Sequence, residues 1–283
     1  MVLRKVGLTG SSGLLGRSIV AEFSKHKIET VQFNEASERT NFESWISGEL
    51  LDKRFGGVDS LVHCAALTSP VEVDYRRYFD VNVRATASIQ NWCNANNVRF
   101  VFISGLSTVE PYYFEFKNNL YVKSKRQATD LVVGSLKDGD IVLKPSSIYG
   151  LGMRDDCLIR KMIRMAHVSP SKLSTMTLPL LAVNYVHARD VARSIHFALK
   201  NKLDGAFCIF GAGMISFEDI RNLLCVAKNS GSVPPASFSS DTLRRRFDPR
   251  QLPSSEVVLP NWFPIESFSD SLSELVECEL ECQ

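Results

Sequence analysis

Apolar and polar residues follow two alternating patterns along the first half of the chain. Short apolar runs at residues 6–9, 30–33, 60–65, 100–103 and 141–143 are typical of buried strands. Between them, residues 17–24, 42–54, 74–96 and 121–133 place apolar side chains at helical spacing. Strands that alternate with helices form right-handed βαβ units, so the pattern predicts an α/β fold with a doubly wound parallel sheet.

The pattern is less regular after residue 145. Strands are predicted at residues 184–186 and 206–210, and helices at 155–166, 189–199 and 217–228. Residues 231–264 are rich in Pro, Ser and Arg, which predicts irregular structure. We therefore expect a first domain of residues 1–145, completed by about 182–210. A smaller C-terminal α/β lobe would contain residues 146–181 and 211–283.

A glycine-rich turn lies between the first predicted strand and helix. Gly10 permits a tight turn, Gly13 lets the backbone approach a pyrophosphate, and Gly16 lets the helix pack closely on the sheet. The N-terminus of the helix offers free N–H groups and partial positive charge to phosphates. This context predicts a Rossmann-type dinucleotide-binding domain rather than a turn without a ligand. The cofactor-binding residues expected in the turn are Gly10, Ser11, Ser12, Gly13, Leu14 and Gly16.

The residues after the second strand bear on the choice of cofactor. An acidic residue there would bind the ribose 2′-hydroxyl and repel a 2′-phosphate. The position holds Phe33 or Asn34, with Arg39 a few residues later, and the nearest acid is Glu35. A neutral amide with a nearby arginine favours NADP over NAD, with a solvated Arg39 as the alternative interpretation.

Tyr121 and Lys125 are four residues apart in the helix predicted after the fourth strand, so their side chains share one face. A free phenol, with a pKa of about 10, is a poor acid or base at neutral pH. A neighbouring lysine and a positive nicotinamide ring would favour the phenolate. The pair is therefore a candidate for proton transfer beside a bound nicotinamide cofactor.

Composition excludes several classes of protein. The 283 residues are 45% apolar, with 33 basic and 31 acidic side chains and a net charge of +2, so a nucleic-acid partner is not expected. No apolar run reaches the roughly 18–20 residues of a membrane span. The seven cysteines form no Cys-x-x-Cys pair, and no cluster has metal-ligand spacing, so we expect a cytoplasmic protein without a metal.

Five segments together resemble the extended short-chain dehydrogenase/reductase superfamily, in particular its nucleotide-sugar epimerase/dehydratase branch. In family order they are residues 9–16 (TGSSGLLG), 62–66 (VHCAA), 80–83 (DVNV), 143–150 (LKPSSIYG) and 185–192 (YVHARDVA). The resemblance implies an NAD(P)-dependent oxidoreductase that reduces or epimerises a keto or hydroxyl centre of a nucleotide-diphospho-sugar. It also implies a homodimer formed through residues 74–96 and the Tyr121 helix.

The resemblance assigns roles to individual residues. Tyr121 would be the acid/base, and Lys125 would tune it and hold the nicotinamide ribose. Ala65, Ala66 and Pro145 would line the cofactor.

Two positions depart from the pattern of the family. Leu106 stands where a Ser or Thr usually orients the substrate carbonyl, so Ser107 or Thr108 would have to serve. Loss of one such donor typically costs about 2.7–4 kcal/mol of transition-state stabilisation. The aromatic residues 112–116 that follow are either a substrate lid or ordinary packing.

The second departure is Val183, which stands where nucleotide-sugar members often carry an arginine that clamps the diphosphate. Arg154, Arg160, Lys172 or the run 244–246 could replace it, although charge runs are usually solvated. The departures leave two alternatives open: a reductase of another small carbonyl compound, and a non-catalytic dinucleotide-binding sensor or scaffold. Retention of Tyr121 and Lys125 argues against the sensor.

The remaining polar residues have structural interpretations. His63 and Cys64 lie in a predicted buried strand and should pack there. His187 is expected to hold a structural hydrogen bond at the junction between domains. Asp155 and Asp156 are expected to cap a helix rather than act in catalysis.

Overall fold

A computed structural model describes residues 3–33, 48–68, 72, 74–230 and 244–281. Its main sheet has seven strands in the order β11-β8-β5-β4-β3-β1-β2, and all neighbouring pairs are parallel. The strands are β1 (Lys5–Thr9), β2 (Glu29–Phe33), β3 (Ser60–His63), β4 (Arg99–Ile103), β5 (Ile141–Pro145), β8 (Gly205–Ile209) and β11 (Val257–Val258). The predicted doubly wound parallel sheet is therefore confirmed.

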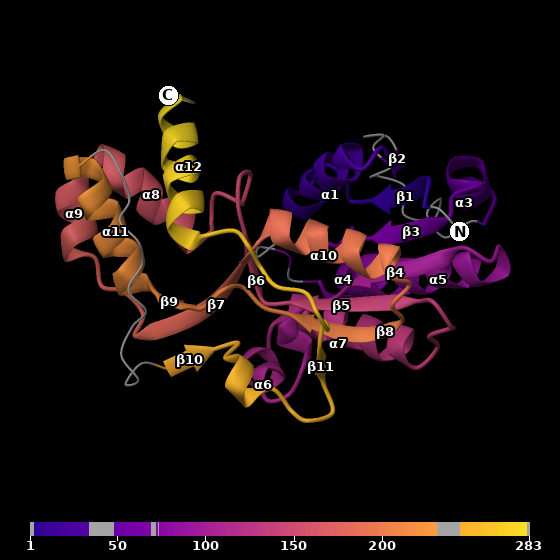
Figure 1. Ribbon diagram of the computed structural model, residues 1–283. Coiled ribbons are helices and arrows are strands. Elements are labelled where there is room, and N and C mark those ends of the chain that lie inside the picture. The colour runs from indigo at the N-terminus through magenta and orange to yellow at the C-terminus, as the bar shows by residue number, and fades with distance from the viewer. Residues whose placement is uncertain (1–2, 34–47, 69–71, 73, 231–243, 282–283) are drawn as a thin grey trace.

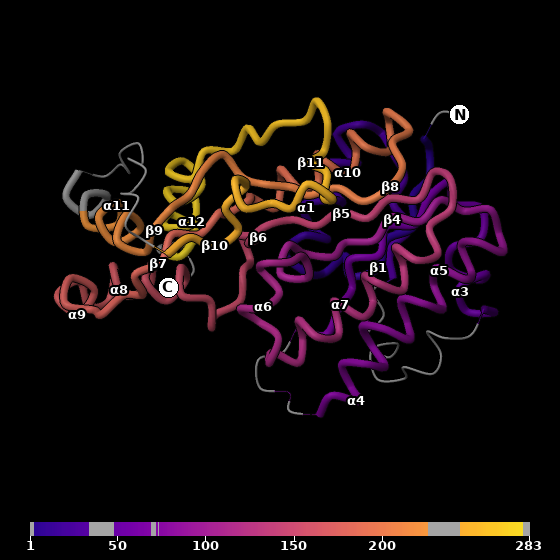
Figure 2. The backbone as a smooth tube through the Cα atoms, turned by 90° about the horizontal axis from the view of Figure 1, so that it is seen from below, coloured from indigo at the N-terminus to yellow at the C-terminus, as the bar shows by residue number. Residues whose placement is uncertain are grey.

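Helices cover both faces of this sheet (Figures 1 and 2). On one face α1 (Leu14–Lys25) and α10 (Ala188–Lys200) share a core with the strands, in which Ile19 and Ile195 meet Leu8. On the other face, α3 (Gly48–Phe55), α5 (Ala85–Ala95) and α7 (Leu120–Val133) form a second core. Because successive strand side chains point to opposite faces, strands covered on both sides are apolar throughout, as the short runs predicted.

The helix predicted over residues 74–96 has a local irregularity. It comprises α4 (Tyr75–Tyr78), the π-helical segment η2 (Phe79–Arg84) and α5. Asp74 caps α4, because its side chain accepts a hydrogen bond from the backbone N–H of Arg76. A π-turn widens the helix locally and is often found at functional positions.

A second, four-stranded sheet contains β6 (Ser147–Tyr149), β7 (Leu181–His187), β9 (Met214–Ser216) and β10 (Arg244–Arg246). Around it lie α8 (Leu158–Val168), α9 (Pro170–Thr175), α11 (Phe217–Ser230) and α12 (Phe268–Glu281), as Figure 1 shows. The chain was expected to rejoin the main sheet from about residue 182, but β7 pairs with β6, β9 and β10 instead. The return is made by α10 and β8.

The described part of residues 231–264 contains only short elements: β10, β11 and a 3-10 turn at Pro249–Gln251. No helix in the described ranges is long and apolar enough to cross a membrane.

Two local predictions are corrected or decided by the packing. Asp155 and Asp156 do not cap α8, which begins at Leu158 after Cys157; they form ion pairs with arginines instead. The aromatic run forms α6 (Tyr112–Phe116). The Tyr112 hydroxyl donates to the carbonyl of Asp248 at 2.5 Å, and its ring lies edge-on to Phe247. At Tyr112 the aromatic run therefore serves packing.

Candidate functional site

The glycine turn between β1 and α1 has the backbone geometry that its spacing predicts. Gly10 has a φ of +76°, and a Cβ there would lie 2.7 Å from the backbone nitrogen of Ala65. A Cβ at Gly16 would collide with the carbonyl oxygen of Gly10. The N–H of Gly13 donates to that same carbonyl at 3.1 Å, which closes the turn. Glycine is therefore required at Gly10 by conformation and at Gly16 by contact.

A cavity of about 800 Å³ opens at this turn, at the N-terminus of α1. The predicted residues Gly10, Ser12, Gly13, Leu14, Gly16, Ala65 and Ala66 all line it. The first turn of α1 holds no acidic side chain, and Arg17 and Arg154 add positive charge to the wall. The start of α1, its helix dipole and the two guanidinium groups fit the pyrophosphate of a dinucleotide, although Arg154 also pairs with Asp156 in the same lining. Ser11 is buried and does not line the cavity.

His63 supports the turn from behind. Its Nδ1 lies 2.7 Å from the Thr9 hydroxyl, and its Nε2 lies 3.0 Å from the Thr86 hydroxyl. Because the Thr86 hydroxyl donates to the Asn82 carbonyl, it must accept from Nε2, which assigns the neutral tautomer protonated there. Burial lowers the pKa of His63 to about 3, with a smaller contribution from the charge of Lys125. The expectation that His63 packs in a buried strand is confirmed.

Cys64, the next residue, lines the cavity and is half-buried rather than fully packed. Its thiol donates to the Thr9 carbonyl at 2.9 Å. Burial raises the pKa of the thiol to about 12, so it is protonated at neutral pH.

Tyr121 and Lys125 lie on the first two turns of α7, where the Asn119 side chain caps the helix. Burial raises the pKa of Tyr121 to about 12, and the cation that acts in the opposite direction is Arg154. Lys125 makes no resolved contribution to this pKa in the absence of a nicotinamide ring. The Lys125 amine donates to the Ile103 carbonyl at 2.7 Å and lies 4.3 Å from the centre of the Phe102 ring.

Burial also lowers the pKa of Lys125 to about 7, against a smaller opposing effect of Cys64. Burial thus favours the protonated phenol at Tyr121 and disfavours the ammonium form of Lys125. Neither side chain lines the 800 Å³ cavity, but both interact electrostatically with residues that do, Arg154 and Cys64.

The segment between β4 and α7 contains the two candidate hydroxyl donors, Ser107 and Thr108, and their surroundings differ. Leu106, which has no hydroxyl to donate, is fully buried and contributes to the core. The buried Thr108 hydroxyl donates to the Gly105 carbonyl at 2.8 Å. Ser107 is half-buried, and its hydroxyl has no hydrogen-bond partner among the described residues. Ser107 is therefore the better placed of the two. The Thr108 carbonyl accepts from Arg126 of α7 at 2.7 Å, which holds the segment beside the tyrosine helix.

Asn82, in the π-helical segment η2, lies in the family-like segment 80–83, but the motif assigned no role to it. Its Oδ1 accepts from the Leu67 N–H at 2.7 Å, and its Nδ2 donates to the Leu67 carbonyl and to the Ser124 hydroxyl. It therefore joins the backbone after β3, beside the cavity, to α7. A lone asparagine on the buried side of an apolar helix was the signal that could have identified it.

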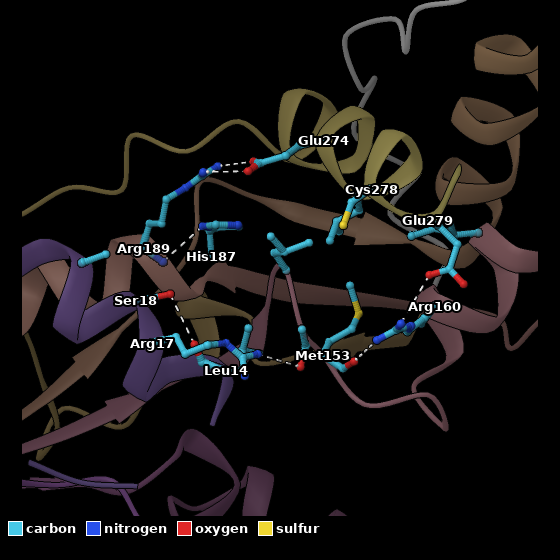
Figure 3. A pocket seen from close by; sticks show the side chains of 15 residues that line it. Leu14, Arg17, Ser18, Met153, Arg160, His187, Arg189, Glu274, Cys278 and Glu279 are labelled. Carbon is cyan, nitrogen blue, oxygen red and sulfur yellow. Dashed lines mark hydrogen bonds and ion pairs between the residues drawn. The ribbon is translucent and has the colours of Figure 1, made fainter. Parts of the chain in front are cut away.

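A second cavity of about 470 Å³ lies beyond the wall formed by Leu14, Arg17 and Met153 (Figure 3). Ion pairs cross its lining: Arg189 contacts Glu274 of α12, and Arg160 contacts Glu279. The Nδ1 atom of His187 accepts from the Arg189 N–H at 3.1 Å and caps α10, which confirms the structural hydrogen bond expected of this histidine. The glycines of the turn line the first cavity and not this one, so the cavity at the glycine turn is the stronger cofactor candidate.

A third cavity, of about 970 Å³, lies between α6 and β10. Its lining includes Arg244 and Arg245, from the run 244–246 that was a candidate diphosphate clamp, and also Arg250. Val183, at the position expected to hold the family's arginine, is buried in β7. Of the other candidates, Arg160 is paired with Asp155 and Glu279, and Arg154 with Asp156. Lys172 is exposed on α9.

Besides Ser11, Tyr121 and Lys125, three more predicted cofactor residues are not found in the cavity lining. Asn34 and Arg39 lie outside the described residues. Pro145 is buried at the end of β5 and is absent from the cavity lining.

Residues 6–209 match the NAD dependent epimerase/dehydratase family. No curated protein sequence matches the chain significantly.

Solved structures of three bacterial proteins have the same fold over nearly their whole length. UDP-N-acetylglucosamine 4-epimerase from Bacillus cereus has a TM-score of 0.73 at 19% identity and covers 97% of this chain and 96% of its own. dTDP-glucose 4,6-dehydratase from Bacillus anthracis in complex with NAD has a TM-score of 0.69 at 17% identity. The match covers 98% of this chain and 97% of that one. RMD from Pseudomonas aeruginosa complexed with NADPH has a TM-score of 0.69 at 17% identity. The match covers 97% of this chain and 99% of that one.

Proposed function

Because the chain belongs to the NAD-dependent epimerase/dehydratase family, we propose that it is an NAD(P)-dependent oxidoreductase acting on a keto or hydroxyl centre of a nucleotide-activated sugar. One observation carries the proposal. The glycine-turn cavity, the half-buried Ser107 hydroxyl and the Tyr121–Lys125 helix converge at the carboxyl ends of the central strands β1, β3 and β4. Ligands of open parallel sheets bind at this edge.

The side chains at this edge divide the work of carbonyl chemistry. A bound nicotinamide cofactor supplies hydride transfer. Tyr121 holds a proton on its phenol oxygen, because burial raises its pKa to about 12, and can donate it to a substrate oxygen. Ser107 donates a hydrogen bond to the same oxygen and polarises the carbonyl. Lys125 uses one N–H on Ile103 and has others for a ribose hydroxyl. A protonated phenol favours reduction of a ketone over oxidation of an alcohol.

NADP is the proposed cofactor. No acidic residue occupies positions 33 and 34, and Arg39 is near in sequence to accept a 2′-phosphate. Phe33 lines the cavity at the end of β2, where the adenosine half of the cofactor would lie. A higher affinity for NADH than for NADPH in a fluorescence titration would contradict this choice.

The arginine-rich cavity is the proposed site for the diphosphate of the sugar nucleotide. Arg244 and Arg246 converge on Glu115 of α6, at 3.4 and 3.2 Å, and Arg250 pairs with Asp248. Guanidinium groups gathered beside the aromatic helix suit a nucleotide diphosphate, because arginine binds phosphate through paired N–H groups.

The protein is proposed to act as a homodimer through η2, α5 and α7. Phe79 on η2 and Leu131 and Val133 on α7 expose apolar side chains, and the three elements pack against one another. Sedimentation at micromolar concentration should give a dimer, and a monomer would contradict the assignment.

One experiment separates this function from its alternatives. NADPH and NADH are titrated, and turnover is then measured with nucleotide-linked 4-keto sugars and with simple ketones. Turnover of the sugar nucleotides alone supports the proposal. Turnover of simple ketones alone identifies a reductase of another small carbonyl compound. Tight cofactor binding without any turnover identifies a sensor.

A further inference from the structure

Three potential metal ligands meet where α1 packs on α10, the two helices that lie side by side in Figures 1 and 2. Glu22 and His26 belong to the end of α1, and His196 lies in the second half of α10. The His26 Nε2 is 3.2 Å from a Glu22 carboxylate oxygen. The rings of His26 and His196 are stacked with centroids 3.7 Å apart. One ligand atom from each residue lies within 4.8 Å of both others.

The electrostatics of this cluster favour a cation. Glu22 is only 7% exposed, yet its partners Lys25 and His26 are themselves largely solvent-accessible. A buried carboxylate is costly unless it is well paired or coordinates a metal. The cluster also lies toward the C-terminal ends of both helices, where the helix dipoles place partial negative charge.

The donor set itself points to a class of ion. Two imidazoles and one carboxylate suit Zn²⁺ and similar divalent transition ions, and not Ca²⁺ or Mg²⁺, which prefer all-oxygen sites.

We propose that Glu22, His26 and His196 form a binding site for a zinc-class divalent ion that links α1 to α10. Each residue supplies one ligand, and water completes a tetrahedral set. The rings of His26 and His196 are stacked, so their nitrogens do not both point at one ion. When the ion binds, one ring therefore rotates about its side-chain torsion so that its nitrogen faces the ion. Glu22 and His26 are four residues apart, but His196 follows 170 positions later; spacing along the chain therefore gives no sign of the site.

The site is far along α1 from the glycine turn, so its role is structural. The ion would join two helices that cover the same face of the sheet. A ligand that binds only the folded state raises the free energy of unfolding in proportion to the logarithm of its concentration. Zinc should therefore raise the Tm of the chelator-treated protein by about 5 °C when it is well above its Kd.

The test is a ZnCl₂ titration of the full chain after treatment with EDTA. Calorimetry should give one ion per chain, and Co²⁺ in place of Zn²⁺ should give the visible absorption bands of a tetrahedral site. His26→Gln and His196→Gln should each weaken binding at least about 100-fold, because loss of a ligand exceeds the effect of losing its hydrogen-bond partner. The matched control His167→Gln, on α8, should bind zinc like the unmodified protein.

Three outcomes would overturn the proposal. The first is no binding, with an unchanged Tm. The second is binding that survives both His26→Gln and His196→Gln, which would assign the zinc to the cysteines. The third is equal loss in His167→Gln. Because His26 is at the exposed end of α1, its substitution should leave the fold intact, and circular dichroism checks this.

Discussion

The two halves of the candidate site are built in different ways. The glycine turn depends on backbone geometry: the φ of Gly10 and the space at Gly16 admit no other side chain without displacement of neighbouring backbone. The segment between β4 and α7 depends on side-chain identity. There Leu106 occupies the expected donor position and contributes to the core, while the half-buried Ser107 presents a hydroxyl.

This difference shows which part of the site tolerates sequence change. A turn defined by its backbone is strained when one glycine is replaced, so its spacing is easily recognised. A hydroxyl donor can move by one residue when the loop places a neighbour in the same space. The departure at Leu106 is therefore compatible with an active site.

Replacing Tyr121 with Phe should give the largest effect, because it removes the only proton that the phenol can transfer. Turnover should fall by up to about 10⁴-fold, while cofactor affinity changes little. Steady-state kinetics and a fluorescence titration measure the two quantities. Tyr113→Phe is the matched control: Tyr113 lies on α6 under Arg126 and should retain full turnover.

Equal turnover in Tyr121→Phe and the unmodified protein would show that another group donates the proton. The catalytic role assigned to the side chains between β4 and α7 would then be wrong. Equal losses in both tyrosine variants would indicate a general disturbance of the segment instead.

His63 should make the glycine-turn half sensitive to acid. Folding lowers its pKa from the ordinary value of 6.5 to about 3, so the folded protein binds fewer protons than the unfolded chain between these values. The free energy of unfolding should therefore fall as the pH drops from about 6.5 to about 3, by about 5 kcal/mol from this group.

Denaturant unfolding across this pH window measures the effect. The slope of the free energy of unfolding against pH gives the number of protons taken up on unfolding. In His63→Gln this number should be smaller by about one, whereas in His167→Gln it should be unchanged. Identical slopes in all three proteins would show that His63 does not carry the acid sensitivity of the turn.

The contrast between the halves also explains what could be read from the sequence. Local spacing predicted the parallel βαβ units, the turn at Gly10–Gly16 and the position of Tyr121 on its helix. It gave no role to Asn82, whose side chain bonds to Leu67 and Ser124, and it could not predict the pairing of β7, because strand partners are chosen by long-range packing.

The spacing of residues along the chain also could not predict the protonation states of Tyr121 and Lys125. The i, i+4 relation put Tyr121 and Lys125 on one face, as predicted, but burial raises the pKa of the phenol and lowers that of the amine. Desolvation depends on the whole surrounding structure, so the helical spacing alone could not show that burial raises the pKa of Tyr121.

Ser107→Ala tests which hydroxyl serves as donor. Turnover should fall by roughly 100- to 1000-fold, because one hydrogen bond to the developing charge is lost. Thr108→Ala should instead lower stability by about 1 kcal/mol, the value of its bond to the Gly105 carbonyl, and leave turnover intact. The combination of kcat and denaturant midpoint separates the two variants. The reverse result would assign the donor to Thr108 and shift the loop register by one.

Gly16→Ala should have a smaller effect, confined to the glycine turn. Its new Cβ meets the Gly10 carbonyl oxygen, and the strain of about 1–3 kcal/mol should appear as weaker cofactor binding or a lower Tm. Gly48→Ala is the matched control, since nothing lies within 4 Å of a Cβ at the start of α3. Titration of NADPH and thermal unfolding compare the two variants. If both bind the cofactor like the unmodified protein, with unchanged Tm, the turn accommodates a side chain, and the distinction between a backbone-defined half and a side-chain-defined half fails.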